Sequence, residues 1–404
     1  MPAVLASTNE EAFAPIHRLV VVCFYHSLVS DWNHGNAHFL RGVVADLLAR
    51  GHDVRVWEPA DGWSRACLLA EIGPSASEAF QQAYPGLESR LYQLDGGGAG
   101  GLDLDQALDG ADLVLVHEWT DPRLVARIGE ARAKGGRFRL LFHDTHHRMV
   151  SDPQAMAVYD LQHYDGVLAF GRVLRDLYLS RGFAARAWTW HEAADTTVFR
   201  PPANQGPRIG LVWIGNWGDG ERSAELREFL LEPVRALNLP ATAYGVRFPP
   251  EGLAALADAG MRVGGWLPNF RVPEVFARHA ATVHVPRRPY VRGLPGIPTI
   301  RVFEALACGI PLVCAPWDDS EGLFLPGEDY LVARDGAEMT THMRTLLAEP
   351  DRAAALARHG LATIHARHTC THRVDELLAI YHELVDSQDG APTAPDQDER
   401  TRTA

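Results

Sequence analysis

Short, continuously apolar runs alternate with amphipathic stretches along most of the chain. Leu19–Phe24 is such a run, and apolar residues then recur at helical spacing over residues 39–48, before Gly51. A second apolar run, Val54–Trp57, follows. Apolar runs of this length are typical of strands buried on both faces of a parallel sheet. The order strand, helix, strand therefore predicts a βαβ unit.

The same alternation continues and predicts two α/β halves. In the first half we expect strands at residues 113–116, 138–142 and 166–170, and helices at 122–134 and around 174–179. In the second half we expect strands at 209–214, 241–245, 281–285 and 312–314, helices at 223–237 and 299–308, and further helices to residue 385. Pro201 and Pro202 interrupt both periodicities and predict the join.

These patterns also predict the domain boundaries. We expect a lead-in at residues 1–16, an N-terminal domain at 17–195, a linker at 196–207 and a C-terminal domain at 208–370. Residues 371–385 should form a helix that returns toward the N-terminal domain, and 386–404 lack core-forming residues, which predicts a disordered tail. The glycine cluster 96–101 follows no strand and is predicted to be a flexible loop, not a dinucleotide signature.

Composition narrows the class of partner. The chain has 404 residues, 47% of them hydrophobic, and a formal net charge of −13. This acidity argues against binding to nucleic acid or to an anionic membrane through bulk charge. The five cysteines never have C-x-x-C spacing, which is typical of a reducing compartment. With neither a basic signal-like N-terminus nor a long apolar run, we expect a cytoplasmic protein without a transmembrane segment.

Ligands of open parallel sheets bind beyond the carboxyl ends of the strands. In the first half these ends carry an unusual set of histidines, aromatic and amide residues: His26, Trp32, His34, Asn36, His117, Trp119, His143, Asp144 and His146. The set favours a binding surface, although any one histidine can equally cap neighbouring backbone. The histidines lie at a strand end and not on a helix, and no thiolate accompanies them, so we expect no transition-metal site.

Asp103 and Asp105 resemble the D-x-D pair that holds a divalent ion on a nucleotide diphosphate. They precede a predicted helix, where aspartate is a common N-cap, and we expect capping to be their role.

The second half contains two loops suited to anion binding. Gly215–Gly220 lies between a buried strand and a helix, so its backbone can approach a ligand, although a tight structural turn is the alternative. A Gly- and Pro-rich loop then leads into a helix beginning near Thr299 and Ile300, whose N–H groups and dipole favour an anion. Arg301 adds a charge that can fork onto phosphate. Glu304 is surrounded by apolar residues, so its carboxylate needs hydrogen-bond partners from elsewhere. Either ligand hydroxyls or Arg301 would supply them.

The segment Arg301–Val313, together with Phe324–Tyr330 and His368–Arg373, resembles the C-terminal half of GT-B glycosyltransferases. The closest likeness is to the CgeB-type, spore-maturation-protein-like branch near the retaining family 4 enzymes. Leu141–His146 looks like the histidine loop of these enzymes, and Trp190–Pro201 looks like their interdomain linker. The resemblance spans residues 18–385.

This resemblance implies a GT-B fold, with two Rossmann-like domains facing across a cleft. The N-terminal domain would hold the acceptor and the C-terminal domain a nucleotide sugar. By the family pattern, Glu304 matches the carboxylate that takes the ribose hydroxyls, Thr299–Arg301 match the diphosphate cradle, and Trp266 and Leu267 fall where the base is recognised. His143 matches the histidine beside the donor sugar, and its ring is expected to project into the cleft.

Two departures from the family pattern concern the donor site. Family 4 enzymes usually carry a second glutamate where this chain has Gly296, and Arg222 is the nearest candidate for their usual Arg–Lys pair. The predicted site therefore has three groups of residues. They are the catalytic His143 and Asp144; the donor-binding Gly215, Asn216, Arg222, Trp266, Leu267, Gly296, Thr299, Ile300, Arg301 and Glu304; and, on the acceptor side, His26, Trp32, His34, Asn36, His117, Trp119 and His146.

The expected activity is transfer of a sugar from a nucleoside diphosphate sugar, with UDP slightly favoured, to a hydroxyl of a small-molecule or glycan acceptor. No cofactor or metal is expected, and retention of configuration follows from the resemblance alone. The alternative is a catalytically weak nucleotide-sugar-binding or scaffold protein of the same fold. A dinucleotide-dependent oxidoreductase is excluded because residues 24–35 contain no G-x-G-x-x-G.

Overall fold

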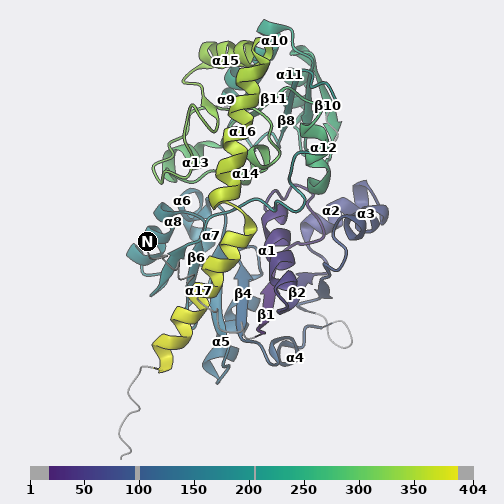
Figure 1. The fold of residues 1–404 in the computed structure, drawn as a ribbon. Coiled ribbons are helices and arrows are strands. Elements are labelled where there is room, and N and C mark those ends of the chain that lie inside the picture. Colours follow the sequence, from purple (N-terminus) through teal and green to yellow (C-terminus); the bar gives the residue numbers. More distant parts are fainter. Residues whose placement is uncertain (1–17, 96–100, 204–205, 390–404) are drawn as a thin grey trace, which may run out of the picture.

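The computed structural model describes residues 18–95, 101–203 and 206–389. The predicted lead-in, most of the glycine loop, two linker residues and residues 390–404 of the predicted tail lie outside these ranges. The described chain forms two α/β domains, one above the other in Figure 1, each built on a parallel sheet. The predicted α/β class with two parallel sheets is confirmed.

The N-terminal domain holds a seven-stranded parallel sheet in the order β3-β2-β1-β4-β5-β6-β7. Its central strands β1, β4 and β5 are almost entirely buried, which explains their apolar sequences. Its elements are β1 (Val20–Phe24), α1 (Ala37–Ala49), β2 (Asp53–Pro59), α2 (Trp63–Glu71), α3 (Ser75–Ala83), β3 (Arg90–Tyr92), α4 (Leu104–Leu108), β4 (Leu113–His117), α5 (Pro122–Ala133), β5 (Arg139–Asp144), α6 (Arg148–Ser151), α7 (Pro153–Met156), β6 (Gly166–Ala169), α8 (Arg172–Ser180) and β7 (Ala187–Thr189).

The C-terminal domain holds a six-stranded parallel sheet in the order β10-β9-β8-β11-β12-β13. Its elements are β8 (Leu211–Ile214), α9 (Ser223–Leu226), the π-helix η1 (Arg227–Leu231), α10 (Glu232–Leu237), β9 (Ala241–Tyr244), α11 (Pro250–Asp258), β10 (Met261–Gly265), the 3-10 helix η2 (Asn269–Arg271), α12 (Val272–Phe276), β11 (Ala281–His284), α13 (Arg288–Gly293), α14 (Ile300–Ala307), β12 (Leu312–Cys314), β13 (Leu331–Val332), α15 (Gly336–Ala348), α16 (Pro350–Arg367) and α17 (Cys370–Asp389).

The long C-terminal helices α16 and α17 follow one another from the upper to the lower domain (Figure 1). α17 packs against α1 of the N-terminal domain and continues to Asp389, so the predicted disorder does not begin at residue 386. A backbone bridge between Ala194 and Thr369 joins the two crossings of the chain between the domains. Among the helices of the described ranges, none combines the length and apolar character needed to span a membrane.

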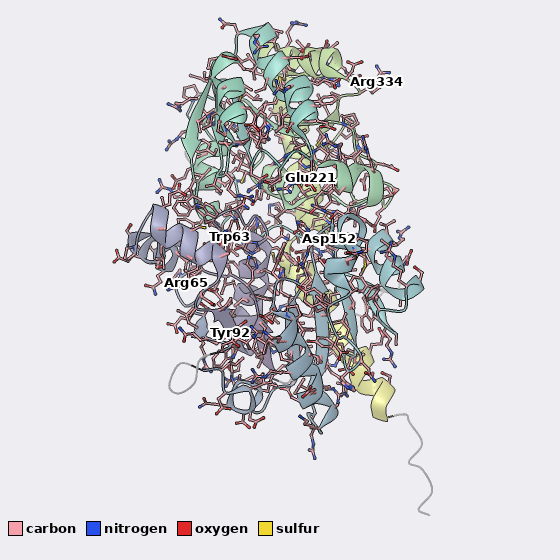
Figure 2. The ribbon with its side chains drawn as sticks, turned by 180° about the vertical axis from the view of Figure 1, so that it is seen from behind. Trp63, Arg65, Tyr92, Asp152, Glu221 and Arg334 are labelled. Carbon is pink, nitrogen blue, oxygen red and sulfur yellow. The ribbon has the colours of Figure 1, made fainter. Side chains whose placement is uncertain are left out.

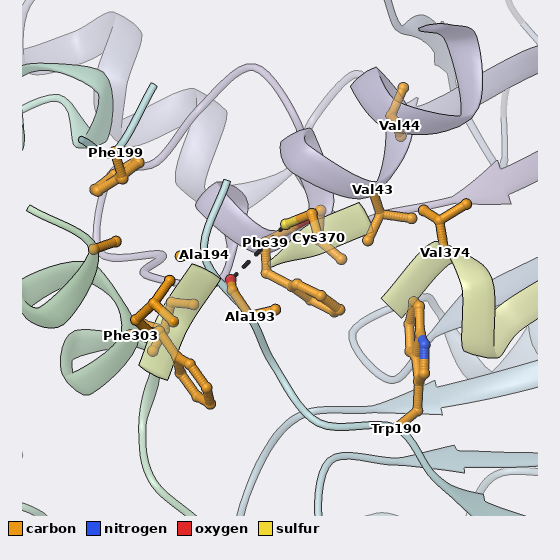
Figure 3. Packing of buried hydrophobic residues seen from close by; sticks show 14 of the residues in the cluster. Phe39, Val43, Val44, Trp190, Ala193, Ala194, Phe199, Phe303, Cys370 and Val374 are labelled. Carbon is orange, nitrogen blue, oxygen red and sulfur yellow. Dashed lines mark hydrogen bonds between the residues drawn. The ribbon is translucent and has the colours of Figure 1, made fainter. Parts of the chain in front are cut away.

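The contact between α1 and the start of α17 is especially close (Figure 3). A Cβ atom added to Gly42 would meet Cys370 Sγ at 2.4 Å, so only glycine fits there without a shift. Around this contact Phe39 packs on Trp190, with their ring centroids 5.1 Å apart. The buried core thus runs from one domain through the linker into the other.

Every strand expected from an apolar run is present within a few residues of its predicted bounds. The missed strands are β3, β7, β10 and β13, which lie at or beside the sheet edges and are short or glycine-containing. The helix expected at 223–237 is continuous but includes the π-turn η1. That turn precedes Pro233, which cannot donate a backbone hydrogen bond.

Candidate functional site

A cavity of about 210 Å³ lies between the two domains at the carboxyl ends of the C-terminal strands. This is where ligands of open parallel sheets bind. The C-terminal domain lines it with Trp213, Ile214, Gly215, Asn216, Arg222, Tyr244, Gly245, Val246, Trp266, Leu267, Asn269, Val283, His284, Val285, Arg287, Tyr290, Thr299, Ile300 and Arg301, and the N-terminal domain with Asp31, Asn33, His34, Gly35 and His146.

Three arginines converge on this cavity from different segments of the C-terminal domain. Arg222 donates to the carbonyl oxygens of Val285 and Asn216, at 2.6 Å each, and its Nε has no acceptor among the described residues. Burial, and then the nearby charges of Arg287 and Arg301, lower the pKa of Arg222 to about 9. The three positive charges repel one another, which disfavours the protonated form of Arg222. A bound anion would relieve this repulsion.

Arg287 is held by two side chains of its own domain, which in turn reach the N-terminal domain. Its Nη1 donates to Glu221 at 2.9 Å, and its Nη2 donates to Asn216 Oδ1 at 3.0 Å. Glu221 in turn lies 3.7 Å from His147 of the N-terminal domain. Figure 2 labels Glu221 at the junction of the domains. Asn216 also crosses the junction and donates to Asn33 Oδ1 at 2.7 Å.

The N-terminus of α14 reaches the cavity wall. Thr299 is its N-cap residue, but within the described chain its side chain makes no capping bond, because Thr299 Oγ1 pairs with His284 Nε2 at 2.9 Å. The buried carboxyl of Glu192, from the interdomain linker, lies near the backbone N–H of Ile300. Burial, followed by the charge of Glu304, raises the pKa of Glu192 well above its usual range. A carboxyl group whose neutral form is favoured thus lies beside this helix terminus, which leaves the positive end of the helix dipole without a neutralising charge from Glu192.

Glu304 lies one turn inside α14 and is completely buried. Its Oε2 accepts a hydrogen bond from Arg301 Nη1, and its Oε1 lies 3.2 Å from His38 Nδ1. Burial alone would raise the pKa of Glu304, but Arg301 and His38 outweigh it and hold the pKa below its ordinary value. The sequence allowed either Arg301 or ligand hydroxyls as partners of Glu304, and the pairing with Arg301 is present in the structure. Glu304 does not line the cavity, whereas Arg301 does.

Aromatic side chains also line the cavity, and one of them, Trp213, lies beneath the Arg222 guanidinium, whose Cζ is 5.4 Å from the ring centroid. Trp213, Tyr244 and Trp266 line it together with Val246 and Leu267. Trp266 is fixed from the opposite domain, because its Nε1 donates to Asp31 Oδ1 at 3.0 Å. A flat apolar ligand would find suitable walls here.

Asp31 is the anchor of this contact between the domains. The backbone N–H of Asn269 donates to its Oδ2 at 2.9 Å, and Arg41 pairs with the same oxygen at 2.9 Å. Contact between the two domains therefore helps to hold Trp266 in place on the cavity wall.

The glycine loop after β8 behaves as its composition suggests. A Cβ atom added to Gly215 would lie 3.0 Å from Arg222 Nη2 and 3.1 Å from the Trp213 ring, so a side chain there would crowd the cavity wall. Gly296 has a different surrounding and lies outside the lining. Its φ is +87°, and a Cβ would meet Glu321 Cγ at 2.6 Å. Glycine is needed there for backbone conformation and packing.

His143 does not project into the cleft, so the expected orientation of its ring is wrong. The side chain is fully buried and packs 4.8 Å from the Trp190 ring and 5.4 Å from the His117 ring. Both ring nitrogens lack partners in the described part of the chain, and burial, then His117, holds the pKa well below its usual value. His143 is the penultimate residue of β5, which is buried along its whole length, and Trp190 of the linker packs against its ring.

Asp144 organises the loop that follows β5. Its Oδ1 accepts the N–H of His146 at 3.0 Å, and its Oδ2 accepts the Tyr178 hydroxyl at 2.7 Å. Burial, followed by the charge of Glu118, raises the pKa of Asp144 to about 7. Through this turn His146, and not His143, faces the cavity. One ring nitrogen of His146, Nδ1, is buried and unpartnered among the described residues.

The remaining acceptor-side candidates form an aromatic group behind and beside the cavity. His26 lies 4.0 Å from the His34 ring, and Trp119 lies 5.3 Å from the His146 ring. Trp119 is 44% exposed, so its indole remains open to solvent at this edge. His117 is fully buried and lies 2.9 Å from Glu118 Oε2. The group is thus contiguous, but only His34 and His146 reach the lining.

Two further candidates have structural partners. Trp32 donates its indole N–H to Glu71 at 2.5 Å, and Asn36 donates to Thr145 Oγ1 at 2.6 Å. Asn36 thereby ties the loop after β1 to the loop after β5. Neither residue lines the cavity.

Asp103 accepts the N–H of Gln106 at 3.0 Å and is the N-cap of α4, which confirms the expected capping role. In residues 18–95, 101–203 and 206–389, no cluster of three or more His, Cys, Asp or Glu side chains has an arrangement suited to a metal ion.

The structure therefore brings eight of the ten predicted donor-binding residues to one cavity and leaves out Gly296 and Glu304. Sequence reasoning missed Arg287, Tyr244, His284 and Glu192. Tyr244 and His284 end the strands β9 and β11, so inspecting every strand end in the second half would have found them. Glu192 and Arg287 carry no comparable local signal.

Comparisons with known proteins agree with this architecture. Residues 222–379 match the family model described as "Glycosyl transferase-like", and a search of curated proteins finds no match. Sucrose-phosphate synthase from Thermosynechococcus elongatus is similar in structure, with a TM-score of 0.62 at 14% identity over 92% of this chain and 100% of that one. HepE from Anabaena in complex with UDP-glucose gives 0.62 at 12% identity over 92% and 100%.

An alpha-glucosyltransferase in complex with UDP and DNA gives a TM-score of 0.64 at 10% identity, over 90% of this chain and 100% of that one. At these identities the likeness shows the fold alone. The chain has the two-domain GT-B fold.

Proposed function

We propose that the protein is a glycosyltransferase that moves a sugar from a nucleoside diphosphate sugar to an acceptor hydroxyl. The observation that carries this proposal is the convergence of Arg222, Arg287 and Arg301 on one interdomain cavity that aromatic side chains also line. Breaking the bond between sugar and diphosphate leaves negative charge on the phosphate. Fixed guanidinium groups stabilise such charge without reorganisation.

The diphosphate would lie against these arginines and the N-terminus of α14, with the base between Trp266 and Tyr244. We expect UDP to be the preferred nucleotide, which the similar structures solved with UDP support. We also expect activity without a metal ion, because guanidinium groups are placed to take the charge that a divalent ion takes elsewhere. Retention of configuration rests on the resemblance to the CgeB-type branch near family 4.

The N-terminal face would bind the acceptor, a small molecule or a glycan. His146 is proposed to act at the reacting end, since it faces the cavity and Asp144 fixes its backbone. His143 then supports this loop from below. The five cysteines are unpaired, which supports a cytoplasmic setting. Glu304, whose two carboxylate oxygens are held by Arg301 and His38, would orient the arginine and not take the ribose hydroxyls that the resemblance assigns to it.

The alternative is a nucleotide-sugar-binding protein without efficient turnover, and the buried ring of His143 favours it. Calorimetry with a panel of nucleotides, combined with detection of released UDP from UDP-sugars, separates the two. A transferase binds UDP and slowly hydrolyses its donor in the absence of acceptor, whereas a binding protein shows affinity alone. A protein with affinity for neither UDP nor another nucleoside diphosphate would refute the proposal.

A further inference from the structure

His38 connects three separate parts of the chain. It lies on α1 of the N-terminal domain and is completely buried. One ring nitrogen faces Glu304 of α14, and the other faces the backbone of Asp195 in the linker, at 3.2 and 2.7 Å. The ring also stacks on Phe199, with centroids 3.6 Å apart and planes 6° from parallel. The stacking and the two polar contacts together hold the His38 ring in a single orientation.

The contacts fix which nitrogen carries the proton. The N–H of Asp195 can only donate, so His38 Nε2 must accept. In the neutral imidazole the proton then resides on Nδ1, which donates it to Glu304 Oε1. The linker backbone thereby makes His38 a hydrogen-bond donor toward the carboxylate.

Glu304 connects His38 to the cavity through Arg301. Its second oxygen holds Arg301, whose side chain is 24% exposed and lines the cavity. A buried carboxylate with one partner missing is costly and rearranges. Without the bond from His38, Glu304 can rotate, and the Arg301 guanidinium loses its fixed support.

We propose that His38 is a positioning residue for the donor site, which holds Glu304 so that Arg301 is aimed at the diphosphate. The proposal rests on the proposed function and deepens it. Affinity for the diphosphate then depends on a side chain of the opposite, acceptor-side domain. Donor recognition and contact between the domains are coupled through a single ring.

Two amides test this assignment in the full-length protein. The side-chain amide of Asn reaches the place of Nδ1, whereas that of Gln reaches the place of Nε2. His38→Asn therefore keeps a donor for Glu304, and His38→Gln keeps only the contact with Asp195. His38→Leu removes both. UDP and uridine are titrated into each variant by calorimetry, because uridine lacks the phosphates that Arg301 would bind.

We expect UDP affinity to fall about tenfold in the Gln and Leu variants and to stay within about threefold of wild type in the Asn variant. Uridine affinity should be unchanged in all three. His368→Gln is the matched control, because His368 is similarly buried but bonds Leu323 O at 2.8 Å, away from Glu304. If the Leu variant does not fold, the comparison of Asn with Gln decides the matter alone.

Equal UDP affinity in the Asn and Gln variants, or a parallel loss of uridine affinity, would overturn the role of His38. Arg301→Leu separates this result from failure of the proposed function. If Arg301→Leu weakens UDP binding and His38→Gln does not, only the positioning role is wrong. If wild type binds UDP no better than uridine, or Arg301→Leu has no effect, the diphosphate site itself is wrong and the role of His38 with it.

Discussion

Replacing Arg222 with methionine should weaken binding of UDP and leave binding of uridine unchanged. Methionine keeps much of the packing of the arginine stem but removes the guanidinium. Arg222 is held by two backbone carbonyls, at 2.6 Å each, and its buried Nε has no acceptor among the described residues. The substitution therefore removes a positioned charge while the surrounding loop keeps its other contacts.

The expected magnitude follows from the hydrogen bond that phosphate would receive. A charge-assisted bond contributes about 1.5–3 kcal/mol, which corresponds to roughly a tenfold to hundredfold loss of UDP affinity. The unliganded variant should unfold within about 1 kcal/mol of wild type, because lost repulsion from Arg287 and Arg301 offsets the two lost backbone bonds.

The pH dependence provides a second signature. Burial and the neighbouring arginines bring the pKa of Arg222 to about 9, and bound phosphate favours its protonated form. Wild-type affinity for UDP should therefore decrease as pH rises through about 9, and Arg222→Met should lose this dependence. Calorimetry between pH 8 and 10, where the phosphates remain ionised, measures both effects, and uridine titrated over the same range corrects for ionisation of the uracil N3–H.

Arg334→Met is the matched control for these experiments. Arg334 is exposed at the far end of the C-terminal domain (Figure 2), where it pairs with Glu338 at 2.9 Å. Its substitution should leave nucleotide affinity unchanged. Equal losses of UDP and uridine affinity in Arg222→Met would refute the phosphate contact, as would full UDP affinity in a folded variant.

Three further predictions concern catalysis, metal and stability. His146→Ala should lower turnover per folded molecule about tenfold with little change in unfolding free energy, whereas His143→Ala, which empties a buried site, should cost about 2–4 kcal/mol of stability in denaturant titrations; the reverse pattern would restore His143 as the reacting group. Donor hydrolysis should survive EDTA, and loss of activity that manganese restores would contradict metal independence. Because the pKa of Asp144 is raised in the folded state, its stabilising contribution is complete below about pH 4 and is lost as pH rises toward 7. Asp144→Asn should flatten this decline in urea unfolding, and an unaltered pH profile would show that the carboxyl titrates normally.

The sequence by itself determined the architecture. Uninterrupted apolar runs such as Leu19–Phe24 and residues 113–116 are typical of strands buried on both faces of a parallel sheet, and their alternation with amphipathic segments predicted the order of strands and helices. Reading the strand ends and the Gly-rich loop also predicted most residues of one cavity wall. This worked because the carboxyl ends of neighbouring parallel strands lie at the same edge of the sheet, where ligands bind. Short edge strands such as β10 escaped prediction, since their exposed and glycine residues carry no apolar signal.

Tertiary structure decided which of these side chains face the cavity. His143 lies near the end of β5 and His146 just beyond it, and the two look alike in sequence. The linker residue Trp190 packs against the first ring, and only the second reaches the lining. The contact between His38 and Glu304 joins residues 266 positions apart, and no local pattern encodes it. Periodicity reports which face of an element is buried. It cannot report which distant segment covers that face, because that depends on how the two domains pack against the linker.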